Sequence, residues 1–343
     1  MRGHYMIDPR LQTLRVLAET GTVTATAESL HLTPSTVSQQ LRRLSAELNV
    51  RLLEPQGRRV RLTPAARTLI DHADTLHAQW ERAVADLAAH RDNGPGELRV
   101  TSVATALGTL VVPAMDRLLS WHPGMTYYLG EDPEADRFRM LLTRERDIAV
   151  VIPAPGTPPS DDERFEQHLL LQEPQDLLVP QGHRFAGRTS VELHEAATET
   201  WLRAGDPRDQ HLLLTSACAA AGFSPRVTHN AVDWSAIAAL VAGGHGICLL
   251  PRLATFPRSD ALVRVPLTGD VVPTRRLVGF VRRGGSRTPL VRDGLRALRE
   301  AAAESGGAHG GAHSGEVRAV SRPGSGSFQP VPCPPGAFPE QSG

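Results

Sequence analysis

The stretch from Thr33 to Leu44 constrains the fold most, because it predicts a short helix with a defined start and two chemically different faces. Thr33 is a good N-cap, and Pro34 suits the first helical position, where no backbone N–H donor is needed. The other face is polar and basic, which suits contacts in a DNA groove but is also typical of an ordinary solvated helix. Helical spacing of apolar residues predicts one buried stripe, formed by Val37, Leu41, Leu44 and Leu48.

The segments before this helix favour the DNA-binding interpretation. A first helix is predicted over 9–19, stopped by Gly21, and a second over 23–30, capped by Thr22. Together with the short turn at 31–33, they give the helix-turn-helix plan.

An arginine-rich hairpin is predicted behind the helix. Extended pieces at 51–53 and 59–62 flank a Pro/Gly turn, which predicts a wing that contacts phosphates or the minor groove, or else only solvated surface. Residues 1–62 carry nine arginines against five carboxylates, although the whole chain has a formal net charge of zero. A basic N-terminal segment on a mildly acidic body fits a small DNA-binding head.

A long helix is predicted to begin at Thr63-Pro64. Its apolar and small side chains recur in alternating steps of four and three, which predicts a dimerisation seam. The alternative is that this helix packs on the body of its own chain. Asp92–Gly96 ends the helix and predicts a hinge. The seam consists of Leu69, Ala73, Leu76, Trp80, Ala83 and Leu87.

From residue 97 onward, short strands and helices alternate, which predicts an α/β domain. Strands are predicted at 98–103, 126–129, 148–152, 169–179 with an interruption at Pro174, 247–250 and 276–281, and helices at 105–119, 207–221, 232–242 and 289–303. Residues 304–343 are rich in Gly, Ser, Pro and His and are predicted to be disordered.

The overall composition, 41% hydrophobic and 22% charged residues, is that of a globular protein, and no apolar run is long enough to span a bilayer. The N-terminus lacks a signal-peptide pattern, so the expected location is the cytoplasm. Cys218, Cys248 and Cys333 lie far apart, so neither a disulfide framework nor a zinc site is predicted, and the first two are expected to be small core residues.

The order and spacing of several motifs resemble the LysR-type transcriptional regulators over about residues 8–303. The motifs are LHLTPSTVSQQL (30–41) and RVRLTPA (59–65) in the head, and ELRV (97–100), DIAV (147–150), AAGFSP (220–225) and VAGGHGI followed by LPR (241–252) in the body. The resemblance implies an α/β chain with an all-α winged helix-turn-helix head, a dimerising linker helix and an effector domain similar to periplasmic solute-binding proteins. The implied bounds are 8–63 for the head, 64–92 for the linker helix, and 97–303 for the effector domain, with 97–163 and 272–303 in one lobe and 164–271 in the other.

The sequence departs from the family's common pattern in the head. Pro34-Ser35 stands where many members have Gln-Pro, so a frequent base-reading side chain is missing, and Pro55 replaces a usual wing arginine. Asn49 and Ala66 replace usual glycines. These changes leave the fold intact but put the DNA sequence that the head reads in doubt.

The expected DNA contacts come from the helix at 33–44 and from the wing. Gln39 suits an adenine edge, and Arg43 suits a phosphate or a guanine. The candidate residues are Thr33, Ser35, Thr36, Ser38, Gln39, Arg43, Arg58 and Arg59.

A small effector is expected in the cleft between the lobes. Ser102 and Thr105 lie where the first strand passes into a helix, and their hydroxyls with the helix amides suit a carboxylate or another anion, although simple N-capping by Thr105 explains the pattern as well. Arg203 is a candidate charge from the facing lobe. Gly243–Gly246 follows a helix and predicts a backbone turn rather than a phosphate loop.

Two other classes of function compete. The chain carries no HExxH, GxSxG, P-loop or strand-anchored GxGxxG motif, so no catalytic residue, cofactor or metal site is predicted. A solute-binding transport protein fits the body but not the basic head. We therefore expect a cytoplasmic regulator, a homodimer or homotetramer, that binds double-stranded DNA and a small-molecule effector and acts with RNA polymerase at its promoters.

Overall fold

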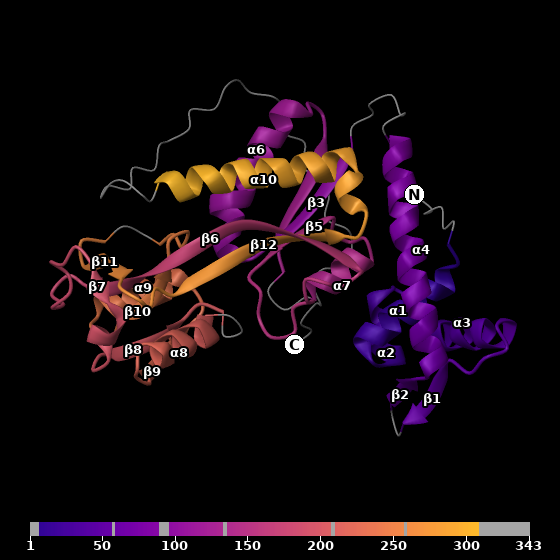
Figure 1. Ribbon diagram of the computed structural model, residues 1–343, viewed down its shortest axis with the longest axis horizontal. Coiled ribbons are helices and arrows are strands. Elements are labelled where there is room, and N and C mark those ends of the chain that lie inside the picture. Colours follow the sequence, from indigo (N-terminus) through magenta and orange to yellow (C-terminus); the bar gives the residue numbers. More distant parts are fainter. Residues whose placement is uncertain are drawn as a thin grey trace, which may run out of the picture. The chain divides into compact units, whose positions relative to one another are not determined.

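The computed structural model describes residues 7–56, 59–88, 96–132, 136–206, 210–256 and 259–308, all within one compact unit, Met1–Gly310. Its N-terminal part has the predicted helix-turn-helix plan followed by a hairpin (Figure 1). Strands β1 and β2 pair antiparallel and form the predicted wing. The elements of the head are α1 (Pro9–Thr20), α2 (Val23–Ser29), α3 (Pro34–Glu47), β1 (Leu53–Gln56) and β2 (Arg59–Leu62).

Local capping sets the ends of the head's helices. The hydroxyls of Thr22 and Thr33 each accept a hydrogen bond from the backbone N–H three residues further on, at 3.2 Å. Gly21 (φ 70°) and Asn49 (φ 52°) adopt the left-handed conformation that ends a helix. The predicted starts of α2 and α3 and the predicted stop of α1 are therefore confirmed.

The head has a core of its own, which includes three members of the predicted apolar stripe. Leu48, expected in the same stripe, is 46% exposed, because α3 ends at Glu47 and no longer holds the next side chain against the core. The core residues are Leu14, Leu17, Ala27, Val37, Leu41, Leu44, Leu52 and Ala66.

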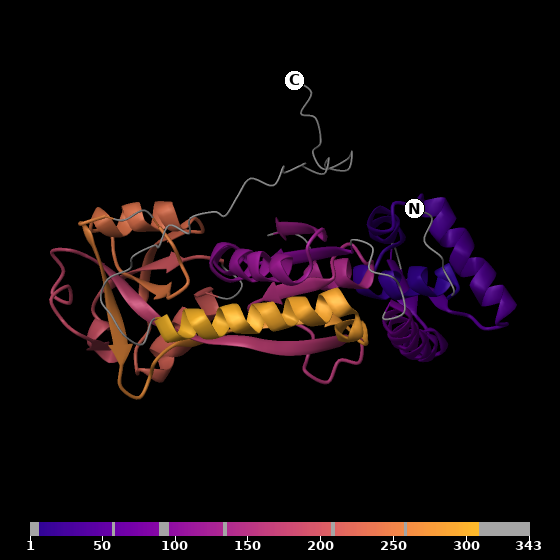
Figure 2. The same ribbon diagram turned by 90° about the horizontal axis from the view of Figure 1, so that it is seen from above.

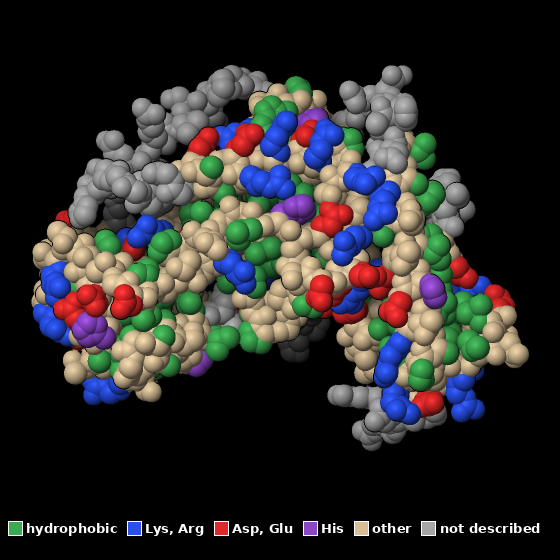
Figure 3. All heavy atoms as spheres, viewed as in Figure 1, with side chains coloured by type: hydrophobic (Ala, Val, Ile, Leu, Met, Phe, Trp, Pro, Cys, Tyr) green, Lys and Arg blue, Asp and Glu red, His purple; other side chains and the backbone are tan. Residues whose placement is uncertain are grey.

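Helix α4 (Pro64–Ala88) follows the wing and has two different apolar faces. Ala73 and Ala78 are buried against the rest of the chain. Leu76 and Leu87, which together with Ala73 belong to the predicted seam, are 51% and 60% exposed, and Figure 3 shows hydrophobic side chains along this helix. The seam is thus divided between an internal contact and an exposed apolar face.

In the described residues, the body contains a mixed eight-stranded sheet in the order β4-β3-β5-β12-β6-β11-β7, with β10 also paired to β6. A separate parallel pair consists of β8 (Thr200–Ala204) and β9 (Arg226–Ala231). The strands of the larger sheet are β3 (Glu97–Ser102), β4 (Thr126–Glu131), β5 (Ile148–Val151), β6 (Phe165–Pro180), β7 (Val191–Glu192), β10 (Cys248–Pro251), β11 (Leu262–Thr268) and β12 (Thr274–Arg282).

Helices cover this sheet, and α10 and α6 lie next to each other over one part of it (Figure 2). We call lobe I the part built on β3–β5 with α6, α7 and α10, and lobe II the part built on β7–β11 with α8 and α9. Strands β6 and β12 connect the two lobes (Figure 1), and separate hydrophobic cores fill them. The helices are α5 (Ala104–Ala106), a π-helical turn (Leu107–Val111), α6 (Val112–Trp121), α7 (Arg137–Leu142), a 3₁₀ turn (Leu193–Ala196), α8 (Gln210–Ala220), α9 (Trp234–Ala242), a 3₁₀ turn (Gly285–Arg287) and α10 (Pro289–Ala308).

Strands β7, β8, β9 and β11 and helix α7 of the body were not predicted, and three predicted segments differ from the structure. Strand β6 continues through Pro174, because its partner changes there from β12 to β10 and β11, and no ladder hydrogen bond is required from the missing N–H. The helix expected over 105–119 is divided by the π-helical turn. Helix α10 extends to Ala308, so the segment predicted to be disordered from 304 begins as helix; residues 309–343 lie outside the described part. None of the helices in the described ranges is long and apolar enough to cross a membrane.

Candidate functional site

The exposed face of α3 carries two side chains that are free to contact another molecule. Gln39 and Arg43 are exposed, and neither side chain has a hydrogen bond or ion pair with another residue of the described part of the chain. Gln40, by contrast, accepts a hydrogen bond of 2.6 Å from the hydroxyl of Thr13 inside the head. The two neighbouring glutamines therefore have different roles, and only Gln39 presents its amide outward.

Three hydroxyls cluster where α3 begins. The Oγ1 atom of Thr33 lies 2.8 Å from the hydroxyl oxygens of both Ser35 and Thr36. Thr33 and Ser35 are exposed, and Thr36 and Ser38 are half-buried. A helix N-terminus with unpaired backbone N–H groups favours an anion such as a DNA phosphate.

The charged residues around α3 and the wing are partly neutralised within the head. Arg61 pairs with Glu54 across the hairpin. Arg10 binds Glu47 at the other end of α3, and its hydrogen bonds lower the pKa of that carboxyl. Arg58 and the side chain of Arg59 lie outside the described residues, so their DNA contacts stay predictions.

A cavity of about 450 Å³ lies between the two lobes. Its walls come from residues at or just after the carboxyl ends of β3, β4 and β5 in lobe I and of β8, β9 and β10 in lobe II. Ligands of open α/β sheets bind at this end of the strands. The polar and aromatic side chains of the lining are Thr105, Glu131, Arg137, Asp206, Gln210, Asp233, Trp234, Ser235, Thr255 and Arg275.

A buried ion pair forms part of the cavity wall. Arg275 donates from Nε to Oε2 of Glu173 at 2.7 Å, and only 3% and 2% of the two side chains are exposed. Arg275 also donates from Nη2 to the hydroxyl of Thr105 at 3.0 Å, and Glu173 accepts from the backbone N–H of Leu253 at 2.5 Å. The network therefore links both connecting strands to the first helix of lobe I and to the segment after β10.

The three predicted effector residues have different positions. Thr105 lines the cavity, but it is not an N-cap: Val103 occupies that position in α5, and the Thr105 hydroxyl accepts from Arg275. Ser102 is fully buried, and its hydroxyl donates to the carbonyl of Val103 at 3.1 Å. Arg203, in β8, is not among the lining residues. Neither Ser102 nor Arg203 lines this cavity, so their part in effector binding stays a prediction.

Sequence reasoning missed the acidic part of the lining. Glu131 ends β4, and Asp233 caps α9 by accepting from the N–H groups of Ser235 and Ala236 at 3.0 and 2.9 Å. The available signal was their place at the carboxyl end of a strand, but β9 was not predicted and β4 was predicted too short.

The two described cysteines are core residues, as predicted. Cys218 and Cys248 are fully buried, and burial raises the pKa of both thiols to about 12. Among the described residues, no group of three or more His, Cys, Asp or Glu side chains is arranged to hold a metal ion.

Comparisons with known proteins agree with this architecture. A family model described as the LysR substrate binding domain matches residues 91–303, and one described as a bacterial regulatory helix-turn-helix protein of the lysR family matches residues 9–67. The DNA-binding transcriptional dual regulator OxyR of Escherichia coli K12 is 29% identical over 80% of this chain and 89% of its own length. The small neutral protease regulatory protein of Streptomyces coelicolor is 30% identical over 78% and 84%.

A solved structure shows the same fold across both parts. A full-length OxyR variant from Pseudomonas aeruginosa covers 87% of this chain and 96% of its own, with a TM-score of 0.59 and 21% identity. The family matches, the helix-turn-helix head and the two-lobed body lead to one conclusion. The chain belongs to the LysR family and is a transcriptional regulator with a helix-turn-helix DNA-binding domain and a substrate-binding domain.

Proposed function

We propose that this regulator binds double-stranded DNA through α3 and the wing. The observation that carries the proposal is the outward-facing pair Gln39 and Arg43, whose side chains have no internal partner among the described residues. Both types of side chain make specific contacts with base edges. The proposed contact set is the predicted one: Thr33, Ser35, Thr36, Ser38, Gln39 and Arg43 of α3 with Arg58 and Arg59 of the wing.

We propose further that a small-molecule effector binds in the cavity between the lobes, beside Thr105 and Arg275. A volume of about 450 Å³ is in the usual range for small ligands. The lining carries carboxylates, from Glu131, Asp206 and Asp233, and two arginines, of which Arg275 is paired with Glu173. Together with the hydroxyl and amide groups of the lining, they suit a small polar effector.

We infer that the protein is a homodimer, or a homotetramer built from such dimers, joined through the exposed face of α4. Leu76, Val84 and Leu87 are exposed on one helix, eight and three residues apart, which places them on one face, as in a helix–helix seam. A second copy of α4 would bury them and place two α3 helices at two half-sites of the DNA. Sedimentation of Leu76→Glu/Leu87→Glu is expected to show monomers; an unchanged oligomer would contradict this seam.

The remaining assignments follow from this function. The proposed domains are a head at 8–63, a linker helix at 64–92 and an effector domain at 97–303. We propose that the protein acts in the cytoplasm, where it works with RNA polymerase at target promoters and catalyses no reaction of its own.

Relatives at 28–29% identity carry the name hydrogen peroxide-inducible genes activator. In this chain Cys218 and Cys248 are buried with raised pKa values, whereas peroxide reacts with accessible thiolates, so neither is proposed as a peroxide sensor; Cys333 lies outside the described residues.

The decisive experiment selects DNA from a random duplex library with the full-length protein. Enrichment of one sequence, protected in footprinting at two half-sites, is expected. The selected DNA is then titrated with and without neutral, cationic and anionic metabolites. Failure to enrich any sequence would contradict the DNA-binding proposal, and a uniform lack of response to metabolites would contradict the effector proposal.

A further inference from the structure

Polar contacts hold the DNA-binding head against lobe I of the same chain. From α1, the side-chain amide of Gln12 donates to the carbonyl of Leu142 at 2.9 Å. From α4, Glu81 pairs with Arg144 at 2.7 Å and with Arg282 at 3.3 Å, and Glu81 is only 8% exposed. Figure 3 shows charged side chains of both signs gathered beside α4.

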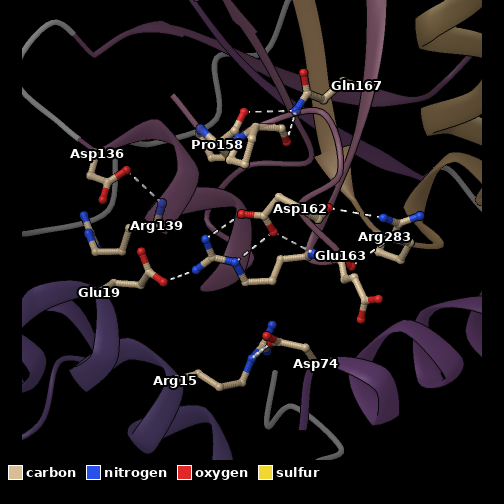
Figure 4. A network of polar contacts seen from close by, with 12 residues as sticks. Arg15, Glu19, Asp74, Asp136, Arg139, Pro158, Asp162, Glu163, Gln167 and Arg283 are labelled. Carbon is tan, nitrogen blue, oxygen red and sulfur yellow. Dashed lines mark hydrogen bonds and ion pairs between the residues drawn. The ribbon is translucent and has the colours of Figure 1, made fainter. Parts of the chain in front are cut away.

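Helices α1 and α4 form one rigid support in this contact. Arg15 of α1 pairs with Asp74 of α4, and only 7% and 9% of the two side chains are exposed (Figure 4). Gly284, after β12, approaches α4 so closely that a Cβ atom there would lie 2.8 Å from the carbonyl oxygen of Ala78. Any shift of lobe I at this contact therefore acts on α1 and α4 together.

Arg164 is bound by two carboxylates that come from different parts of the chain. Its guanidinium donates to Asp162 at 3.0 Å from Nε and at 2.8 Å from Nη2, and it pairs through Nη1 with Glu19 near the end of α1 (Figure 4). Burial raises the pKa of Glu19, and the charge of Arg164 opposes that shift. Arg164 therefore offsets part of the cost of burying the Glu19 carboxylate.

The loop that carries Arg164 begins at the effector cavity. Ile152, directly after β5, lines that cavity, and Arg164 directly precedes β6. Between them the chain contains Pro153, Pro155, Pro158 and Pro159, whose fixed φ angles restrict its conformations.

Hydrogen bonds tie this loop to the connecting strands. The amide of Gln167 donates to the carbonyls of Pro158 and Pro159 at 3.0 and 2.7 Å. Arg283 donates to the carbonyls of Glu163 and Asp162 at 2.9 and 3.2 Å. These hydrogen bonds further restrict the conformations of the loop between Ile152 and Arg164.

A second cavity, of about 510 Å³, follows the loop from the effector cavity to the head. Its lining includes Val103, Ile152 and Asp206, which also line the effector cavity, and it reaches Glu19 and Arg164. The ion pair between the head and lobe I thus lies on the wall of a space that adjoins the effector site.

We propose that Arg164 couples the effector site to the DNA-binding head: an effector that displaces the loop 152–164 changes the contact of Arg164 with Glu19, and thereby the position of α1 and α3. The displacement reaches α3 because Thr13 of α1 binds Gln40 of α3. The effector acts in this way only if its affinity differs between the state with the Arg164–Glu19 ion pair and the state without it. This inference rests on the proposed function, since it concerns the regulation of the same cavity.

Hydrogen exchange of the full-length protein tests the contact without DNA or effector. The variants are Glu19→Gln, Arg164→Gln and the double variant Glu19→Gln/Arg164→Gln. Glu97→Gln is the matched control, because Glu97 pairs with Arg99 at 2.5 Å within lobe I. Backbone amides at the end of α1 and in the loop are expected to exchange about three- to tenfold faster in both single variants, as for loss of a partly buried ion pair, and no faster in the double variant than in Arg164→Gln, because both changes break the same contact. Rates equal to those of the control would overturn the proposal.

Affinity for the selected DNA tests the coupling itself. Glu19→Gln and Arg164→Gln are expected to change the Kd by about threefold or more, in the same direction, while Glu97→Gln leaves it unchanged. Equal Kd values for all variants would overturn the coupling even if the exchange rates differ. Wild-type protein that selects no DNA would overturn the proposed function instead, and the exchange rates would then decide separately whether the contact exists.

Discussion

Arg275 of β12 and Glu173 of β6 form an ion pair that water hardly reaches, with 2.7 Å between Nε and Oε2. The pair lies in the strands that connect the lobes, and its remaining atoms bind Thr105 and the backbone N–H of Leu253. A buried pair of this kind contributes little net stability compared with apolar side chains, but the loss of one partner leaves a buried charge uncompensated.

Glu173→Gln is therefore expected to lower the free energy of unfolding by about 3–5 kcal/mol. Glu97→Gln, which breaks an exposed pair, is expected to cost about 0–1 kcal/mol. Urea unfolding followed by circular dichroism measures both. The double variant Glu173→Leu/Arg275→Met removes both charges and should lose less than the single variant. If Glu173→Gln and the control Glu97→Gln lose the same free energy of unfolding, the Glu173–Arg275 pair does not have the expected role in stability.

Gln39→Ala is expected to alter the sequence preference of DNA binding, because each lost bidentate base contact costs about 1–3 kcal/mol. Gln40→Ala is the matched control, since its amide binds Thr13 inside the head. That variant is expected to lose about 1 kcal/mol of folding stability but to keep the preference. Binding curves on a panel of single-base variants of the selected DNA separate the two outcomes; coinciding curves for wild type and Gln39→Ala would refute the contact.

Arg58→Ala is expected to weaken binding to all DNA sequences alike. A phosphate contact releases about one counterion, so the slope of log Kd against log salt should fall by about 0.9 in magnitude. Arg188→Ala, in lobe II and paired with Glu195, is the control for the loss of one arginine. An unchanged slope would argue that the wing does not touch the backbone.

His77 of α4 is expected to make the protein less stable at low pH. Burial, followed by the charges of Arg15 and Arg144, lowers its pKa to about 3, whereas the unfolded residue titrates near 6.5. The unfolded state therefore binds the additional proton between these values, and stability falls as the pH falls through that window, by up to about 1.4 kcal/mol per pH unit.

Urea unfolding of wild type and His77→Gln between about pH 5 and pH 7.5 measures this effect. The variant is expected to lose the part of the pH slope that comes from one proton. His72→Gln, an exposed histidine on the same helix, serves as the control. If the free energy of unfolding changes with pH equally in wild type and His77→Gln, then His77 binds its proton equally well in the folded and the unfolded state.

Cys218 and Cys248 are expected to stay reduced when the folded protein is treated with hydrogen peroxide, because a thiol with a pKa of about 12 supplies almost no thiolate near neutral pH. Mass spectrometry of the peptides measures their oxidation. The same treatment in urea is the positive control, since unfolding restores access and an ordinary pKa. Oxidation of either residue in the folded state, together with a change in DNA affinity, would point to a peroxide response.

Local signals explain why the head was predicted well. The caps Thr22 and Thr33 and the stop at Gly21 are satisfied by atoms within a few residues, so the sequence alone specifies those helix ends. Strands of the body behave differently. Strand β8 pairs with β9 across the intervening helix α8. Strand β8 is mostly buried and β9 is mostly exposed, so neither shows the alternation that marks a half-buried strand.

The sequence by itself determined the helix-turn-helix head, the wing, the long α4 and the α/β character of the body, because capping, periodicity and alternation act over short distances. Only the tertiary structure decided which face of α4 stays exposed and that Ser102 is buried. It also decided that Glu173 pairs with Arg275, 102 residues further along the chain, and that Glu19 pairs with Arg164, 145 residues further along. These contacts depend on how strands from distant parts of the chain pair. The sequence around a charged residue does not indicate which distant residue it will contact.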